Sequence, residues 1–234
     1  MKTFTLLSTT ILAFTGLQPE TISQLFSENN RRHIPEYTDD SQQTSTFEGV
    51  LEMQGLGGAV TYYIKGDKVR SEIKDEGQLV IFLYEFNGTS YTSIMPAEKI
   101  YMEAPVHQIN FSDQELKEIN DCESKISKTG EKLNISGITC EKWTANCGND
   151  RSEVWVTREL GFEWGQLFHP MFRAAYTGSM QQYGELKGYF PMKMVVPDEK
   201  GKQTVFMEVG RLEKKKLSDE LFSIPTGYKK MASR

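Results

Sequence analysis

The chain has 234 residues, of which 38% are hydrophobic, and this length and composition predict one folded domain with a sizeable core. Its formal net charge is -5, whereas proteins that bind the nucleic-acid backbone need a dominant basic face. Nucleic acid is therefore excluded as an expected partner.

The N-terminus has the pattern of a secretory signal peptide. Met1 and Lys2 precede an apolar run that ends near Leu17, with the small residues Thr15 and Gly16 near a plausible cleavage point. The run is too short for a membrane span, which needs about 20 apolar residues, so no integral membrane span is expected. We therefore expect residues 1–17 to be a signal peptide and the protein to be periplasmic or secreted.

The next segment, residues 18–45, is polar and lacks apolar periodicity, which predicts a flexible leader before a single domain over residues 46–234. The first part of that domain reads as consecutive strands with turn residues between them. The expected strands are 47–54, 59–65, 68–74, 78–85, 89–95 and 99–103. Such an order predicts an antiparallel meander.

A capping box at Ser112 and Glu115 predicts a short helix to about Asn120. Strands are then expected at 123–129, 138–145 and 152–157, with a turn between Lys132 and Gly137. The most convincing helical pattern follows in residues 164–180, where large apolar residues recur at helical spacing. Pro170 lies within this pattern, so the helix either kinks there or ends and restarts, and we favour the break.

Two long strands, 185–196 and 204–214, and a capped helical turn near the C-terminus complete the expected elements. The total of about eleven strands and two or three helices predicts a sheet-dominated α+β domain.

Three cysteines, Cys122, Cys140 and Cys147, lie close together in the sequence. A hairpin between the flanking segments would bring Cys122 near Cys147 and leave Cys140 buried, which makes a Cys122–Cys147 disulfide possible. Three unlinked thiols are an equal alternative. Their spacings fit no zinc motif, so no metal site is expected.

The sequence contains no pattern typical of catalysis. The three histidines, His33, His107 and His169, are far apart, and none stands at a ligand or triad spacing from a Cys, Asp or Glu. Nucleophile motifs and phosphate-binding glycine loops are also missing. We therefore expect neither an enzyme nor a cofactor.

Several sequence blocks together resemble a known bacterial family. They are YYIKGDKVR from Tyr62, KIYM from Lys99, GITCEKW from Gly137, EVWVT from Glu153, GYFP from Gly188 and LFSIPTGY from Leu221. These blocks resemble the exported family called domain of unknown function 4412, over about residues 46–231. That family looks like a relative of the lipoprotein carriers and receptors LolA and LolB. The resemblance implies a strongly curved, unclosed antiparallel half-barrel with helices over an apolar cavity.

Two interpretations of the apolar helix remain open. It covers the sheet as an ordinary core element, or it lines a pocket for a flexible lipid chain. The candidate lining residues are Trp164, Phe168, Met171, Phe172, Tyr176, Met180, Phe190, Met192 and Met194. We expect an exported, non-enzymatic protein that binds a hydrophobic small molecule or a lipidated protein. The alternative is a protein-interaction or envelope-scaffold module whose barrel is filled by its own side chains.

Overall fold

The computed structural model describes residues 47–55, 58–75, 77–86, 88–105, 125–147, 150–167, 186, 188–198 and 200–231. The expected signal peptide, the polar leader, the 112–120 helix and all three histidines lie outside these residues. Within them, strands dominate and helix is scarce.

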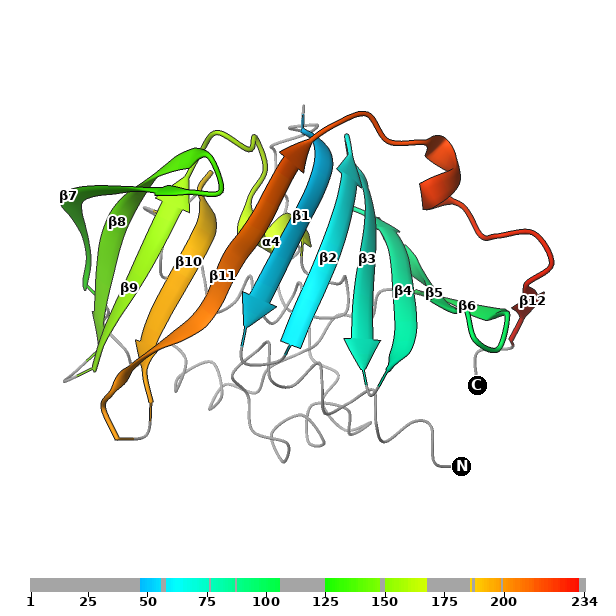
Figure 1. Cartoon of the computed structure of the whole chain (residues 1–234), viewed down its shortest axis with the longest axis horizontal. Helices are drawn as coiled ribbons and strands as arrows, with labels where there is room; N and C mark the ends of the chain where they lie inside the picture. Colours follow the sequence, from blue (N-terminus) through cyan, green and yellow to red (C-terminus); the bar gives the residue numbers. More distant parts are fainter. Residues whose placement is uncertain are drawn as a thin grey trace.

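Twelve strands form one sheet, with the order β12-β6-β5-β4-β3-β2-β1-β11-β10-β9-β8-β7 (Figure 1). The strands are β1 (Glu48–Gly55), β2 (Gly58–Lys65), β3 (Lys68–Asp75), β4 (Gln78–Glu85), β5 (Ser90–Met95), β6 (Ile100–Pro105), β7 (Lys125–Ile135), β8 (Ile138–Cys147), β9 (Asp150–Thr157), β10 (Phe190–Pro197), β11 (Gln203–Lys214) and β12 (Lys229–Lys230). The two described helices are the single turns α4 (Trp164–Leu167) and η2 (Asp219–Phe222), the latter a 3-10 helix.

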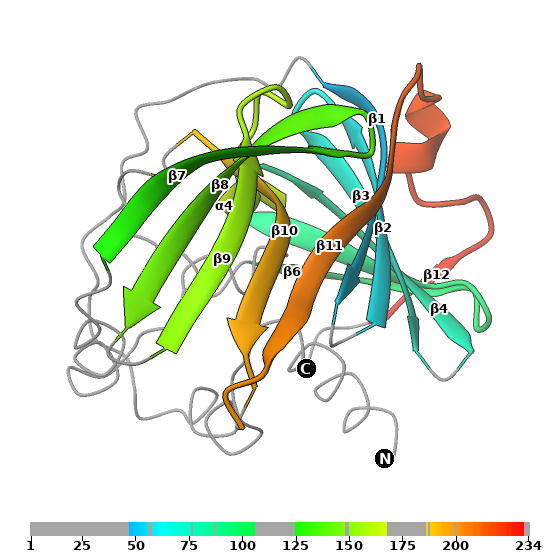
Figure 2. The same cartoon turned by 60° about the vertical axis from the view of Figure 1, so that its left-hand side comes forward.

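The chain builds the sheet from neighbours in sequence, as the turn signals predicted. Hairpins join β1 through β6 and β7 through β9, while the pairing of β1 with β11 joins these two runs in the centre. Register shifts interrupt β10 and β11, which curve through the middle of the sheet (Figure 2). Such bulges increase local twist.

All eleven expected strands are present, although some bounds differ. The strand expected to end at residue 129 continues to Ile135, because the turn is tighter than predicted. It consists of Ser136 and Gly137, both with positive φ, and the Asn134 side chain accepts a hydrogen bond from the Gly137 amide at 3.1 Å. A two-residue turn of this kind matches the twist of the flanking strands.

The expected half-barrel needs correction. The sheet is open, with β7 and β12 at opposite edges, and it is not strongly curled. It is also mixed, because β12 pairs with β6 in parallel. Strand β12 was not expected, because two lysines carry no strand pattern. Lys229 and Lys230 pair with β6 because the C-terminal segment before them packs beside it.

Strand β4 separates two apolar layers. Its Phe82 and Tyr84 belong to the main core cluster, whereas Ile81 and Leu83 belong to a second cluster. Successive side chains of a strand point to opposite faces, so β4 is covered on both sides. The second cluster also packs against Ile224 of the C-terminal segment, residues 215–231, which runs along the outside of β3 to β6 (Figure 1).

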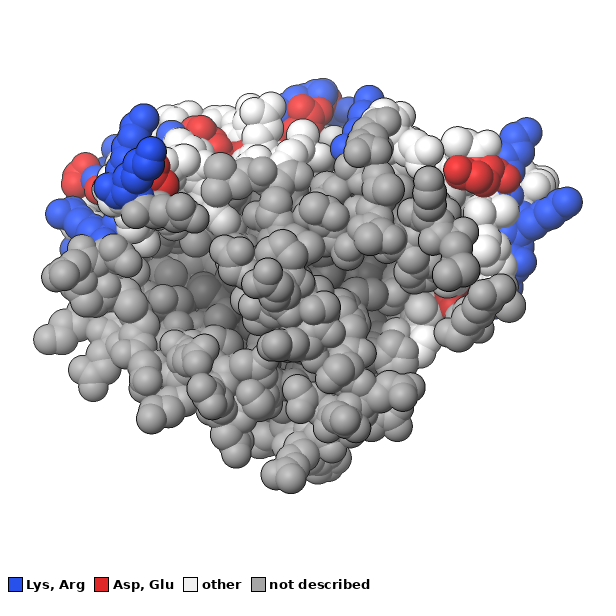
Figure 3. All heavy atoms as spheres, turned by 90° about the horizontal axis from the view of Figure 1, so that it is seen from below, with Lys and Arg blue, Asp and Glu red and all other residues white. Residues whose placement is uncertain are grey.

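Viewed from below, charged side chains of both signs lie along the upper margin of the molecule and at its two sides (Figure 3). Many of them form ion pairs, such as Arg211 with Glu52 at 2.9 Å and Lys193 with Glu208 at 3.1 Å. Among the described residues, no helix is long and apolar enough to cross a membrane.

Candidate functional site

The main core cluster occupies one face of the sheet and includes residues from both halves of it. Its buried members are Phe47, Leu51, Met53, Ile64, Val69, Phe82, Tyr84, Phe86, Tyr91, Ile135, Ile138, Cys140, Leu160, Phe162, Trp164, Leu167, Phe190, Met192, Met207 and Val209. Within the described part of the chain, the buried side chains include no charged group. The cluster is therefore mainly apolar.

Four candidate residues from the sequence analysis lie in or against this cluster. Trp164 is 6% exposed, and Phe190 and Met192 are completely buried. Met194 is half-buried and packs against the cluster. The rings of Trp164 and Phe190 meet edge to face at 5.6 Å between centroids. The structure thus brings together the start of the expected helix and strand β10.

The other candidates fall where the structure gives no description. Phe168, Met171, Phe172, Tyr176 and Met180 lie outside the described residues, as does the predicted break at Pro170. Cys122 also lies outside them, and only the backbone of Cys147 is described, as the last residue of β8. The possible disulfide therefore stays a prediction.

Two further methionines belong to the same group and were missed. Met53 of β1 and Met207 of β11 are almost completely buried in the cluster. Met207 stands opposite Met194 of β10 in the antiparallel register. With Met192, this gives four methionines on three adjacent strands. Strand alternation places Met53 with Leu51 and Met207 with Val209 on the buried face, but no local pattern shows that β1, β11 and β10 become neighbours.

Helix α4 is held against the cluster by a buried hydrogen bond. The Tyr84 hydroxyl of β4 donates to the Leu167 carbonyl at 2.6 Å. The preceding loop is tied to the start of β10, because the Gly188 amide donates to Glu163 Oε1 at 2.9 Å. The Tyr84 hydroxyl and the Glu163 carboxylate therefore fix the position of Trp164 over the sheet.

Burial makes two titratable groups in this region, Cys140 and Tyr91, harder to ionise. Burial raises the pKa of the Cys140 thiol to about 11 and also raises the pKa of the Tyr91 hydroxyl. A thiol with a raised pKa is a poor nucleophile near neutral pH. The described residues contain no group of three or more His, Cys, Asp or Glu side chains that could hold a metal ion.

Several solved structures share parts of this architecture. An uncharacterized conserved protein from Thermus thermophilus has a TM-score of 0.40 and 11% identity, with 81% of this chain and 91% of that chain covered. In the MucA/MucB complex of Pseudomonas aeruginosa, the matched chain has a TM-score of 0.34 and 12% identity, covering 76% of this chain and 55% of that chain. A structure of MucB alone gives a TM-score of 0.34 and 11% identity, with 80% and 59% covered.

This chain thus spans a little over half the length of the MucB chains. No curated protein matches the sequence. The kinship with LolA and LolB that the sequence blocks implied stays a prediction. Residues 47–228, however, match the family described as Domain of unknown function (DUF4412). That span is most of the chain, so the family part of the resemblance is confirmed, and the chain belongs to the DUF4412 family.

Proposed function

We propose that the chain is an exported, non-enzymatic binding protein that holds a hydrophobic chain, a lipid or the acyl group of a lipidated protein, against the core face of its sheet. The observation that carries this proposal is the group of four methionines, Met53, Met192, Met194 and Met207, on β1, β11 and β10. Methionine side chains are flexible and polarizable, so they adapt to ligands without a fixed shape.

The point of entry is the region around Met194. This residue is half-buried, whereas its neighbours Met192 and Met207 are 0% and 1% exposed. A chain that enters beside Met194 would displace contacts between methionines and would not need to break a hydrogen bond of the sheet. Trp164, which packs on Phe190, would border the bound chain.

The burial of Phe190 and Met192 favours a second candidate function, a protein-interaction or envelope-scaffold module. Because Phe190 and Met192 have no exposed surface, the described part of the face is filled by the protein's own side chains. A protein-interaction or envelope-scaffold module with a filled core would look like this and would bind no apolar ligand.

Uptake of a fluorescent fatty acid separates these two functions. The purified protein is titrated with 11-(dansylamino)undecanoic acid, whose emission rises and shifts to the blue in an apolar site. We expect saturable binding that falls at least tenfold in Met194→Glu, because a carboxylate beside the chain must be desolvated. Val205→Glu is the matched control, since Val205 lies on the adjacent strand and is 41% exposed. No binding by the folded wild type would support the filled module, whereas equal binding by both variants would contradict binding beside Met194.

A further inference from the structure

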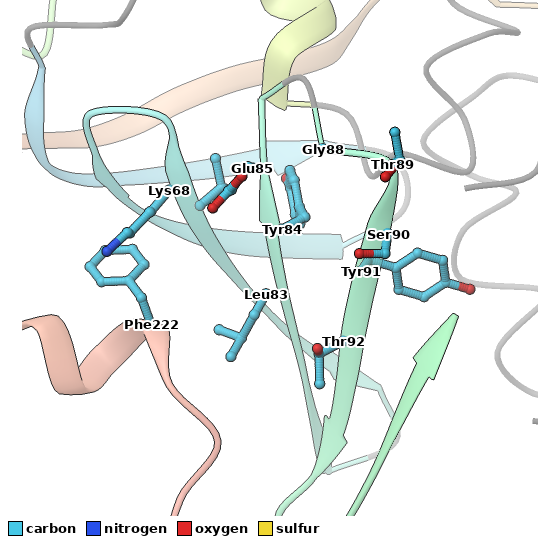
Figure 4. A pocket seen from close by; sticks show the side chains of 11 residues that line it. Lys68, Leu83, Tyr84, Glu85, Gly88, Thr89, Ser90, Tyr91, Thr92 and Phe222 are labelled. Atoms are coloured by element: carbon cyan, nitrogen blue, oxygen red, sulfur yellow. The ribbon is translucent and has the colours of Figure 1, made fainter. Parts of the chain in front are cut away.

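A pocket of about 480 Å³ lies outside the main core cluster, between the C-terminal segment and strands β3 to β5 (Figure 4). Small-molecule sites commonly have about 300 to 1,000 Å³. The pocket was not expected from the sequence, because its walls come from residues more than 100 positions apart. Phe222 of η2 forms one wall, and the β4–β5 hairpin forms another.

Strand register decides which side chains face this pocket. Lys68 stands opposite Glu85, and Leu83 stands opposite Thr92, so these pairs share the outer face of the sheet. Ser90, two residues before Thr92, lies on the same face. Val69, Tyr84 and Tyr91 also border the pocket, but they belong to the main core cluster on the other face. Figure 4 shows Tyr91 directed away from Leu83 and Phe222.

The charges in the pocket balance. Lys68 contributes one positive charge and Glu85 one negative charge, and the Lys68 ammonium is also 4.0 Å from Asp219. An anion or a cation would gain little in such a site, because each meets a like charge as well as an opposite one. The balance therefore favours a ligand without net charge.

The lining has both apolar and polar groups, and Leu83 and Thr92 are cross-strand neighbours within it. Leu83 and Phe222 supply apolar surface, while Ser90 and Thr92 supply hydroxyls that both donate and accept hydrogen bonds. In Figure 4 the Phe222 ring lies on the side of the pocket opposite Ser90 and Thr92. An acyl chain does not suit this lining, because the hydroxyls and charged side chains that face the pocket would lose hydration.

We propose that this pocket binds a neutral sugar in its pyranose form. A pyranose ring has an apolar face of C–H groups, which fits against Phe222 and Leu83, and a rim of hydroxyls, which fits Ser90, Thr92, Glu85 and Lys68. The site is distinct from the methionine group of the core face and stands independently of the function proposed for it.

The Phe222 wall is fixed without a ligand. The Arg70 guanidinium donates to the Leu221 carbonyl at 3.0 Å, directly before Phe222. Lys65 donates to the Leu217 carbonyl at 3.0 Å and pairs with Asp219 at 3.0 Å. Because the wall is already in place, little ordering cost accompanies binding.

Saturation-transfer-difference NMR on the purified full chain tests the proposal, with methyl β-glucoside and N-acetylglucosamine as probes. We expect transfer to the C–H protons of one ring face and a dissociation constant that rises about five- to tenfold in Thr92→Val, which removes one hydrogen-bonding hydroxyl. Phe222→Ala should lower the transfer to those protons further. Thr139→Val, an exposed strand residue of β8, is the matched control.

Thr92→Val keeps the side-chain shape and the strand preference, so it separates binding from folding. Equal affinity of Thr92→Val and Thr139→Val, or no transfer to either sugar from the wild type, would overturn the proposal. Transfer to acetate or tetramethylammonium ions in place of the sugars would also overturn it, because it would show an ion site.

Discussion

Phe190 occupies a central position among the aromatic residues of the core. Its ring meets those of Phe162 and Trp164 edge to face, at 5.2 Å and 5.6 Å between centroids. Such pairs add stability beyond the burial of their surface. Because Phe190 begins β10 and Trp164 begins α4, this one side chain joins the sheet to the segment that covers it.

Phe190→Ala is therefore expected to destabilise the protein by about 3 to 5 kcal/mol, through lost burial and the cavity that remains. Urea unfolding followed by circular dichroism measures this change. Val205→Ala provides the comparison, since Val205 is 41% exposed and its replacement should cost less than about 1 kcal/mol. Similar midpoints for the two variants would contradict the assigned role of Phe190.

At the scale of elements, the C-terminal segment is attached by specific polar contacts as well as by its apolar residues. The Leu217 amide donates to Glu48 Oε1 at 2.7 Å, and Ser218 caps η2 by accepting from the Glu220 amide. Further along, the Lys229 amide donates to the Lys99 carbonyl at 2.9 Å, which begins the pairing of β12 with β6. The capped turn expected from the sequence is therefore present.

Arg70→Ala should loosen this segment. It removes the bond to the Leu221 carbonyl and leaves half-buried Glu72 without the guanidinium, which lies 2.7 Å from its carboxylate. Hydrogen exchange measured by mass spectrometry should be at least several-fold faster in residues 221–231, with a stability cost of about 1.5 to 3 kcal/mol.

Arg211→Ala is the control for this experiment. Arg211 also pairs with two carboxylates, Glu52 and Glu213, but the pairs are exposed and do not contact η2 or β12. Exchange in residues 221–231 should stay at the wild-type rate. If the two variants exchanged alike, the Arg70 contact would not be what holds the segment.

At the scale of the whole molecule, burial makes several groups resist deprotonation. The pKa values of Tyr62, Tyr91 and Cys140 are all raised, with desolvation by burial as the main cause. The folded protein therefore holds these protons more tightly than the unfolded chain does. The associated stability is fully present below the ordinary pKa values of 9.0 for Cys and 10.0 for Tyr, and it is lost as the pH rises above them.

The urea midpoint should consequently be constant from pH 7 to about pH 8.5 and fall steadily up to about pH 11. Tyr62→Phe should reduce this fall, because it removes one of the groups whose pKa burial raises. A midpoint that does not change between about pH 8 and pH 11 would contradict the assigned effect of burial.

Local patterns were sufficient to place most strands, because alternation and turn residues act over a few positions. The expected strands 59–65 and 68–74 left Gly66 and Asp67 for the β2–β3 turn, and the capped helical turn expected near the C-terminus is η2. Trp164, Phe190, Met192 and Met194 lie in or against one core cluster, since an apolar helix start and an apolar strand both bury their side chains. Met53 and Met207 were overlooked because their group forms only when β1, β11 and β10 become neighbours.

The sequence by itself determined the family, the succession of β1 to β11 along the chain, and the absence of a recognisable catalytic motif. Each of these depends on residue types at short spacing. Tertiary structure decided the rest. The pairing of β1 with β11, the open and mixed sheet, and the pocket between Phe222 and the β4–β5 hairpin all join distant segments. No local pattern encodes such contacts, since their free energy comes from burying surfaces that meet only in the folded chain.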